Sequence, residues 1–327
     1  MKEITYAEAV IEALDEEMDR DPNVVLLGED VGPLGGNFAT TKGLWEKHGE
    51  WRVKDTPISE AAIIGCALGA ALTGLRPVAE LMFADFIPTA MDQIANQVAK
   101  IRYMSGGQAT VPLVIRTPIG GGRSSAAQHS QSLQALLAHI PGLKVALAAT
   151  AYEAKGLLKM AIRDDNPVVL FEHKMEYKNS FLIPEEEYVI PFGEAAIKRE
   201  GQDVTVVATC SMANRSLKLA DDLAGDGIEL EVIDPRTIVP LDLDTIVESL
   251  KKTGRVVVVD EGHYTCGVAA EIAQRIMESA FDYLDAPIER VCTKQVPIPF
   301  SPTLESYVVP DEDNIKEAVY KTLNFKF

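Results

Sequence analysis

The chain has 327 residues, of which 47% are hydrophobic and 24% charged, as in an ordinary globular protein with room for about two domains. Its 49 acidic residues outnumber its 31 basic ones, and the net charge of −18 argues against binding to nucleic acid or to an anionic membrane. The surplus acid suits either plain solubility or a basic partner protein.

Targeting and metal signals are also lacking in the sequence. The longest uncharged run, 61–75, is shorter than the roughly 20 residues that a bilayer crossing needs. The first residues, MKEITYAEAV, have neither a signal-peptide core nor an Arg-rich transit character, so we expect a cytoplasmic, prokaryotic protein. The four cysteines are scattered without a CxxC spacing, which predicts reduced thiols and no zinc site.

Strands and helices alternate through the first half of the chain. A T-x-x-E capping box at Thr5 and Glu8 predicts the opening helix. Apolar runs predict buried strands at 23–30, 76–83, 111–116, 144–148 and 166–173. Helices are expected between them at 57–74, 85–107, from about 130, and at 151–164. This alternation implies a parallel sheet covered on both faces.

The second half repeats the alternation after a break. From about Lys178 to Gly201, prolines and an acidic run indicate a connector. Strands are then expected at 204–210, 228–234, 255–261 and 288–293, with helices at 212–224, 242–252, 267–280 and from Asp311. We therefore predict two doubly wound α/β domains, at 1–185 and 202–327, joined by a connector at 186–201.

The helix at 57–74 is unusual because small residues line one of its faces. Gly65 and Gly69 fall on one face with Ala62 and Leu72, so a neighbouring element can approach closely. That element belongs either to the same chain or to another subunit, and the sequence leaves both alternatives open.

Glu60 opens the same helix and has no charged neighbour downstream until Arg76. Dipole and N–H groups at a helix N-terminus favour the anion, whereas apolar surroundings favour the protonated acid. These opposed effects suit a carboxyl that exchanges its proton near neutral pH. The alternative is simple helix capping, for which Ser59 is the better residue.

A glycine-rich loop at 116–132, RTPIGGGRSSAAQHSQS, contains a second candidate, His129. A histidine on such a loop can move protons near neutral pH, although a surface turn with an incidental histidine is the alternative. The glycines do not form a G-x-G-x-x-G fingerprint, so a dinucleotide site is disfavoured.

Two aromatic residues, Phe83 and Phe86, follow a strand that should end on the same sheet edge as Glu60. Ligands of parallel sheets bind at the carboxyl ends of strands, so an aromatic side chain there suits stacking on a flat ring. Packing in the core is the alternative function of these rings.

Many segments, taken in order, resemble one family. They are GEDV (28–31), DTPISE (55–60), GLRP (74–77), YMSGG (103–107), AAQHSQS (126–132), HIPGLKV (139–145), AKGLLK (154–159), AIRDDNPVV (161–169) and, in the second half, DVTVVATCSM, EVIDPRTIVPLD and VVVVDEGH. The chain is similar in these respects to the β subunit of the thiamine-diphosphate-dependent 2-oxoacid dehydrogenase E1 component, in the transketolase-like superfamily. The resemblance implies a thiamine-diphosphate-binding, pyrimidine-type domain followed by a transketolase C-terminal-type domain.

The resemblance also implies roles for four residues. Glu60 matches the carboxyl that hydrogen-bonds N1′ of the aminopyrimidine and drives the tautomerisation by which the cofactor's own amino group takes the thiazolium proton. Phe86 matches the aromatic that stacks on this ring, and Glu29 in GEDV lies near it. His129 matches the active-site histidine that steers proton transfer and the handover to the lipoyl group of E2.

In this family the α subunit carries the GDG-to-Asn-Asn motif that holds Mg²⁺ and the diphosphate. The GDG at 225–227 here has no adjacent pair of asparagines downstream, so the resemblance implies half an active site in an α2β2 tetramer. A structural K⁺, held by main-chain oxygens in the family, would lie by position at Leu113, Ala161, Ile162, Asp164 and Asn166. The second domain is expected to serve dimerisation and docking of the basic subunit-binding domain of E2, the lipoyl acyltransferase.

The resulting hypothesis is an E1 β subunit acting on pyruvate or acetoin, with a branched-chain 2-oxoacid as the alternative substrate. A non-catalytic scaffold subunit should have lost Glu60 or His129, and both are present. A transketolase complete in one chain would need the diphosphate motif, and a nicotinamide-dependent oxidoreductase would need a glycine fingerprint.

Overall fold

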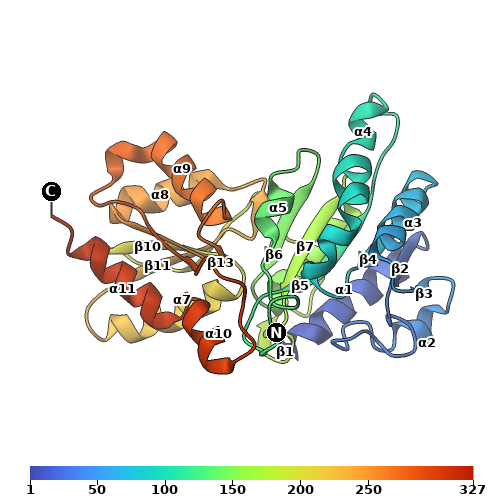
Figure 1. Ribbon diagram of the computed structural model, residues 1–327, viewed down its shortest axis with the longest axis horizontal. Helices are drawn as coiled ribbons and strands as arrows, with labels where there is room; N and C mark the ends of the chain where they lie inside the picture. Colours follow the sequence, from blue (N-terminus) through green and yellow to red (C-terminus); the bar gives the residue numbers. More distant parts are fainter. Residues whose placement is uncertain (327) are drawn as a thin grey trace. The chain divides into compact units, whose positions relative to one another are not determined.

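The computed structural model describes residues 1–326, which form two compact units (Figure 1). The first comprises Met1–Ile119 and Leu136–Phe192, and the second comprises Gly120–Ala135 and Gly193–Phe327. Both are α/β units built on a largely parallel sheet, which confirms the predicted fold class. The glycine-rich loop belongs by its contacts to the second unit, although it precedes the connector in sequence. No helix within residues 1–326 combines the length and the apolar character needed to cross a membrane.

Six parallel strands make up the sheet of the first unit, in the order β6-β7-β5-β4-β2-β3. After β3 the chain crosses to the other side of β2 to form β4, so the winding direction reverses between β2 and β4. Ligands of such sheets bind outside the carboxyl ends of the strands at this reversal. The strands are β2 Val24–Gly28, β3 Val53–Asp55, β4 Arg76–Glu80, β5 Val114–Ile119, β6 Lys144–Ala148 and β7 Val168–His173, and a separate antiparallel pair joins β1 Lys2–Thr5 to β8 Ser180–Ile183.

The capping box predicted at the start of the chain is present. The Glu8 N–H donates to Thr5 Oγ1 at 3.2 Å, and the Thr5 N–H donates to the Glu8 carboxylate at 2.7 Å, so α1 begins at Tyr6. α1 packs against α6, and both cover the sheet through one apolar cluster that includes Leu14 and Leu26. The helices of this unit are α1 Tyr6–Arg20, α2 Leu44–His48, α3 Glu60–Leu72 and α6 Ala151–Arg163.

The prediction of one continuous helix at 85–107 is wrong, because the segment is divided into three short elements. These are the 3₁₀ helix η1 Ala84–Ala90, the π-helix η2 Gln93–Val98 and α4 Ile101–Met104. Pro88 lies inside η1 and has no N–H to donate, which disfavours a continuous α-helix there. The helix predicted from about Ser130 begins later, as α5 Gln134–Ala138.

The second unit has a five-stranded sheet in the order β14-β13-β10-β11-β9, in which only β9 is antiparallel to its neighbour. α8 and α9 pack together on one face, and α7 and α11 pack together on the other (Figure 1). β9 lies within the predicted connector. The elements are β9 Ala196–Arg199, β10 Val204–Ala208, α7 Ser211–Ala224, β11 Leu230–Asp234, β12 Thr237–Val239, α8 Leu243–Thr253, β13 Val256–His263, α9 Val268–Ala280, η3 Phe281–Tyr283, β14 Glu289–Thr293, α10 Pro302–Val308 and α11 Glu312–Leu323.

A buried charge network crosses the carboxyl-terminal edge of the first unit's sheet. Arg116 of β5 donates to both oxygens of Glu172 of β7, at 3.0 and 2.6 Å, and also to Glu80 of β4. The Tyr177 hydroxyl donates to Glu172 at 2.7 Å. Burial raises the pKa of Glu80, an effect that Arg116 opposes and that the carboxylates of Glu172 and Glu29 reinforce. One guanidinium therefore joins three adjacent strands by serving two buried acids.

Replacing this arginine should destabilise the chain severely. In Arg116→Met, two buried carboxylates lose their counter-charge, and we expect the free energy of unfolding to fall by about 3–5 kcal/mol in urea titrations of the purified chain. The matched change Arg215→Met breaks an ion pair with Glu312 whose arginine side chain is 39% exposed, and it should cost less than about 1 kcal/mol. Equal effects of the two substitutions would contradict a structural role for the network.

Candidate functional site

The carboxyl ends of β2 and β4 lie close together because a glycine in β2 has no side chain there. Gly28 pairs with Glu80 in the strand register, and a Cβ at Gly28 would lie 2.9 Å from the Glu80 carbonyl oxygen. Two residues later Asp30 adopts a left-handed conformation, with φ of 57°, so the chain turns sharply after Glu29. This turn places Glu29 at the winding reversal of the sheet.

Glu60 is the first residue of α3, as predicted, and it is half-buried. Its Oε2 accepts a hydrogen bond from the Thr89 hydroxyl at 3.0 Å. The same hydroxyl lies 2.8 Å from the carbonyl oxygen of Phe86, so Thr89 links Glu60 to the η1 turn. Within residues 1–326 the Ser59 side chain makes no capping hydrogen bond to this helix. The carboxyl of Glu60 is therefore held from η1 rather than used as a simple cap.

Glu29 and Glu60 form a pair of interacting acids. The Glu29 side chain is buried, with 7% of the residue exposed. Burial raises the pKa of Glu29, and the negative charges of Glu60 and Asp30 raise it further. The negative charge of Glu60 therefore disfavours ionisation of Glu29.

Phe86 is half-buried at the edge of a row of aromatic rings. It packs edge-on against Phe83 with ring centroids 5.8 Å apart, and Phe83 packs edge-on against Phe38 at 5.6 Å. Phe38 in turn contacts Tyr177 at 5.1 Å, whose hydroxyl belongs to the buried charge network. The row ties the orientation of Phe86 to the sheet edge.

The small-residue face of α3 is largely open. A Cβ at Gly69 would meet no atom within 4 Å, whereas one at Gly65 would lie 3.3 Å from the Gln93 side-chain oxygen. Ala62 and Leu72 are exposed on the same helix. Within residues 1–326 only the Gly65 end of this face is therefore covered.

His129 lies in the second unit, on the glycine-rich loop, and is half-buried. The main-chain N–H of His129 donates to the Ala126 carbonyl at 3.4 Å. Ser124 and Ala126 both adopt left-handed conformations, with φ of 53° and 61°. Side-chain-bearing residues rarely adopt this conformation, so other contacts must hold the loop in place.

Within residues 1–326, four of the five main-chain oxygens predicted to hold K⁺, all except that of Asn166, accept hydrogen bonds from within the chain. Arg76 donates to the carbonyls of Ile162 and Asp164 at 2.7 and 2.8 Å. The carbonyls of Leu113 and Ala161 accept from the N–H groups of Val168 and Asp164. Asn166 donates both its main-chain and its side-chain N–H to the Asp164 carboxylate. The K⁺ site stays a prediction.

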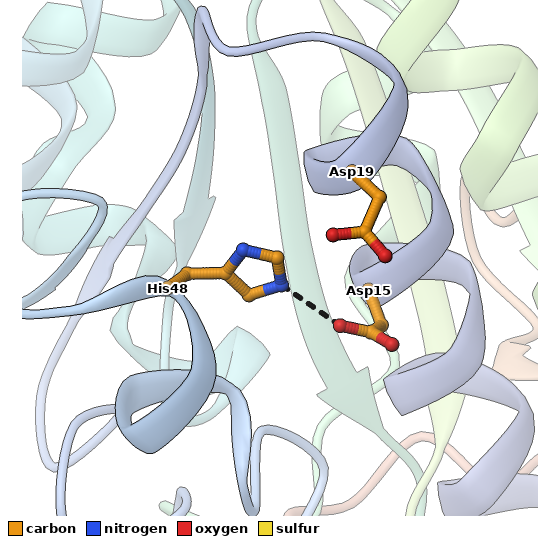
Figure 2. A group of neighbouring side chains, drawn as sticks. All are labelled: Asp15, Asp19 and His48. Carbon is orange, nitrogen blue, oxygen red and sulfur yellow. Dashed lines mark hydrogen bonds and ion pairs between the residues drawn. The ribbon is translucent and has the colours of Figure 1, made fainter.

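A separate group of metal-ligating types, Asp15, Asp19 and His48, lies between α1 and the end of α2 (Figure 2). His48 Nε2 is 2.8 Å from Asp15 Oδ1, a partner that the sequence did not reveal. Lys47 Nζ lies 2.7 Å from oxygens of both aspartates. The ammonium group thus supplies the positive charge, and the group is a surface ion-pair network.

Sequence reasoning missed Thr89 and the acids around Arg116. Thr89 carries no local signal, because its hydroxyl becomes relevant only when η1 folds against the start of α3. Glu80 and Glu172 lie at the ends of apolar strands, and an acid ending such a run is the one signal that would have marked them.

Comparisons with known proteins identify a family for each half of the chain. Residues 2–180 match the family described as "Transketolase, pyrimidine binding domain", and residues 193–315 match "Transketolase, C-terminal domain". A solved structure titled "Split gene transketolase, inactive beta4 tetramer" superimposes with a TM-score of 0.82 at 25% identity, covering 99% of this chain and 100% of that one.

Three curated relatives cover nearly the full length. The chain is 50% identical to the acetoin:2,6-dichlorophenolindophenol oxidoreductase subunit beta of Cupriavidus necator, with 96% of each chain covered. It is 50% identical to the pyruvate dehydrogenase E1 component subunit beta of Rickettsia felis, with 98% of each covered. It is 44% identical to the 2-oxoisovalerate dehydrogenase subunit beta of Bacillus subtilis, covering 99% of this chain and 100% of that one. With both domains matched in order and relatives at this identity, the chain belongs to the transketolase-like family, among the β subunits of 2-oxoacid dehydrogenase E1 components.

Proposed function

We propose that this chain supplies the proton-handling half of an E1 active site acting on pyruvate or acetoin. The observation that carries the proposal is the placement of Glu60 beside Glu29 at the winding reversal, with Thr89 joining Glu60 to the turn that carries Phe86. Relatives that act on acetoin and pyruvate by name share 50% identity, against 44% for the 2-oxoisovalerate relative. We keep the branched-chain substrate as the alternative.

The residues present fit the aminopyrimidine of thiamine diphosphate. Such a ring needs a carboxyl that can share a proton, a second group that keeps this proton in place, and an aromatic surface. Glu60, Glu29 and Phe86 are of these types and lie at one sheet edge. When bound, thiamine diphosphate supplies a carbon nucleophile for the carbonyl group of the substrate and accepts the electron pair released by decarboxylation.

In this proposal each residue has one task. Thr89 holds Oε2 of Glu60, which leaves Oε1 to share a proton with the ring nitrogen. Burial and the neighbouring charges of Glu60 and Asp30 raise the pKa of Glu29, so this side chain binds a proton more readily than an exposed glutamate does. Phe86 orients the ring by stacking, and its own position is fixed by Phe83.

The diphosphate and Mg²⁺ would be held by an α subunit in an α2β2 tetramer. The chain lacks a GDG-to-Asn-Asn motif, and its α3 helix presents an open small-residue face at Gly69. We assign this face to the subunit interface. The net charge of −18 suits the basic subunit-binding domain of E2, whose lipoyl domain would receive the acyl group.

Removing the proton-sharing ability of Glu60 should abolish decarboxylation. Glu60→Gln keeps the shape of the side chain, so reduction of 2,6-dichlorophenolindophenol by the complex should fall by about 10²-fold or more while the tetramer still assembles. Glu46 occupies the first turn of α2 and is exposed, so Glu46→Gln is the matched control and should leave the rate unchanged. Near-normal turnover in Glu60→Gln would refute the assignment.

Loss of the His129 imidazole should affect acyl handover most. We expect His129→Ala to lower acylation of a lipoyl domain by about 10²-fold and to lower dye reduction much less. His139 is exposed, and His139→Ala serves as the control. Unchanged lipoyl acylation in His129→Ala would remove this residue from the mechanism.

A larger side chain on the open face of α3 should block assembly without harming the fold. Gly69→Leu adds bulk at a position where a Cβ would meet no side chain within 4 Å among residues 1–326, and leucine is the better helix former. The melting temperature of the chain alone should not fall, while its dissociation constant for the α subunit should rise at least about tenfold in mass photometry. Gly69→Ala adds a single carbon and should have the smaller effect. Wild-type assembly by Gly69→Leu would place the interface elsewhere.

A further inference from the structure

The glycine-rich loop of the second unit is fastened by a buried carboxylate far away in sequence. Glu305 of α10 has only 4% of its surface exposed. Its Oε1 accepts the Gly122 N–H and its Oε2 accepts the Ser124 N–H, both at 2.8 Å. Among residues 1–326, every side-chain hydrogen bond of Glu305 goes to this loop. The carboxylate thus has one evident function, which is to bind loop amides.

A second carboxylate extends the same arrangement. Glu261 in β13 is 7% exposed, and its Oε1 accepts the Gly121 N–H at 2.5 Å. Three N–H groups within four residues of the loop therefore point at two buried acids. Bonds from amides to ionised carboxylates are stronger than neutral ones, which suits a loop that lacks a regular ladder.

The segment that follows His129 in sequence is also held by a buried carboxylate. Gln134, at the start of α5, donates from Nε2 to Asp260 at 2.8 Å, and Asp260 also accepts from Thr209 at 2.6 Å. We call the contacts of Glu305 to the Gly122 and Ser124 amides the clamp. In sequence, His129 thus lies between the clamp and Gln134, which is held by Asp260. The loop between these points contains the left-handed Ser124 and Ala126, whose backbone conformation needs support from such contacts.

Glycine at 121 permits this close approach. A Cβ there would lie 3.0 Å from Val309 Cγ2 and 3.4 Å from Glu305 Oε1. A side chain at this position would therefore require Val309 or the Glu305 carboxylate to shift. Gly121 in the glycine run thus allows the loop to pack closely against the Glu305 carboxylate.

We propose that Glu305 is a positioning residue for acyl transfer, which holds the loop of His129 in its working conformation through the Gly122 and Ser124 amides. The proposal rests on the proposed role of His129. Glu305 itself touches neither substrate nor cofactor. It acts through the loop backbone, because an error of about 1 Å in the position of a reacting group costs up to a hundredfold in rate.

The test uses Glu305→Gln in the complex assembled with its α subunit. The amide keeps the size of the side chain, but its NH₂ group faces one of the two loop amides and cannot accept from it. We expect acylation of a lipoyl domain to fall by about tenfold to a hundredfold, with dye reduction within about twofold of wild type. Hydrogen exchange in peptides from 120–135 should rise at least about tenfold. Glu317→Gln, the same change at an exposed residue of α11, should alter none of these.

Two further variants separate this proposal from the role of His129. In a His129→Ala background, Glu305→Gln should cause no additional loss of lipoyl acylation, because the clamp acts through this histidine. If Glu305→Gln does not assemble, Gly121→Ala disturbs the same contact from the loop side and should give the same selective loss. If His129→Ala alone has no effect while Glu305→Gln still loosens the loop and lowers acylation, the role of His129 fails and the clamp stands.

Unchanged hydrogen exchange in Glu305→Gln would overturn the proposal, as would lipoyl acylation within twofold of wild type. Equal losses of dye reduction and of lipoyl acylation would also overturn it, because a merely structural role would lower both together.

Discussion

A single guanidinium serving two buried carboxylates organises the edge of the first unit's sheet. Arg116 donates two hydrogen bonds to Glu172 and also donates to Glu80. Glu80 in turn pairs in register with Gly28, directly before Glu29. Several carboxyls thus gather around one guanidinium at this sheet edge, and burial together with neighbouring negative charge raises the pKa of Glu80 and of Glu29.

Under the proposed function, this gathering of carboxyls would suit proton chemistry on a basic ring. A ring nitrogen that accepts a proton gains from a neighbouring acid whose ionisation is discouraged by other acids. The aromatic row from Tyr177 to Phe86 connects the same charge network to the Phe86 ring. Packing and electrostatics at this edge thus depend on one another.

Much of this arrangement is predictable from the sequence, but not all of it. The long central strands and most helices follow from apolar periodicity, and the capping box at Thr5 marks the first helix correctly. The short strands β1, β3, β8, β9 and β12 are not predicted, because three or four residues carry too little periodicity. The continuous helix predicted across Pro88 fails, because periodicity does not distinguish α, 3₁₀ and π segments. Glu60 is identifiable as an isolated acid at a helix start, whereas Thr89 is not, because its importance arises from folding of η1 onto that start.

The loop of His129 shows that domain membership cannot be predicted from order along the sequence alone. It precedes the connector, yet its amides bind Glu305 and Glu261, which come more than a hundred residues later. Exchange of the second domain between relatives at the connector would separate this loop from the acids that shaped it. A chimera that also carries residues 120–135 from the donor would keep loop and clamp together, so the natural unit of recombination in this chain is discontinuous.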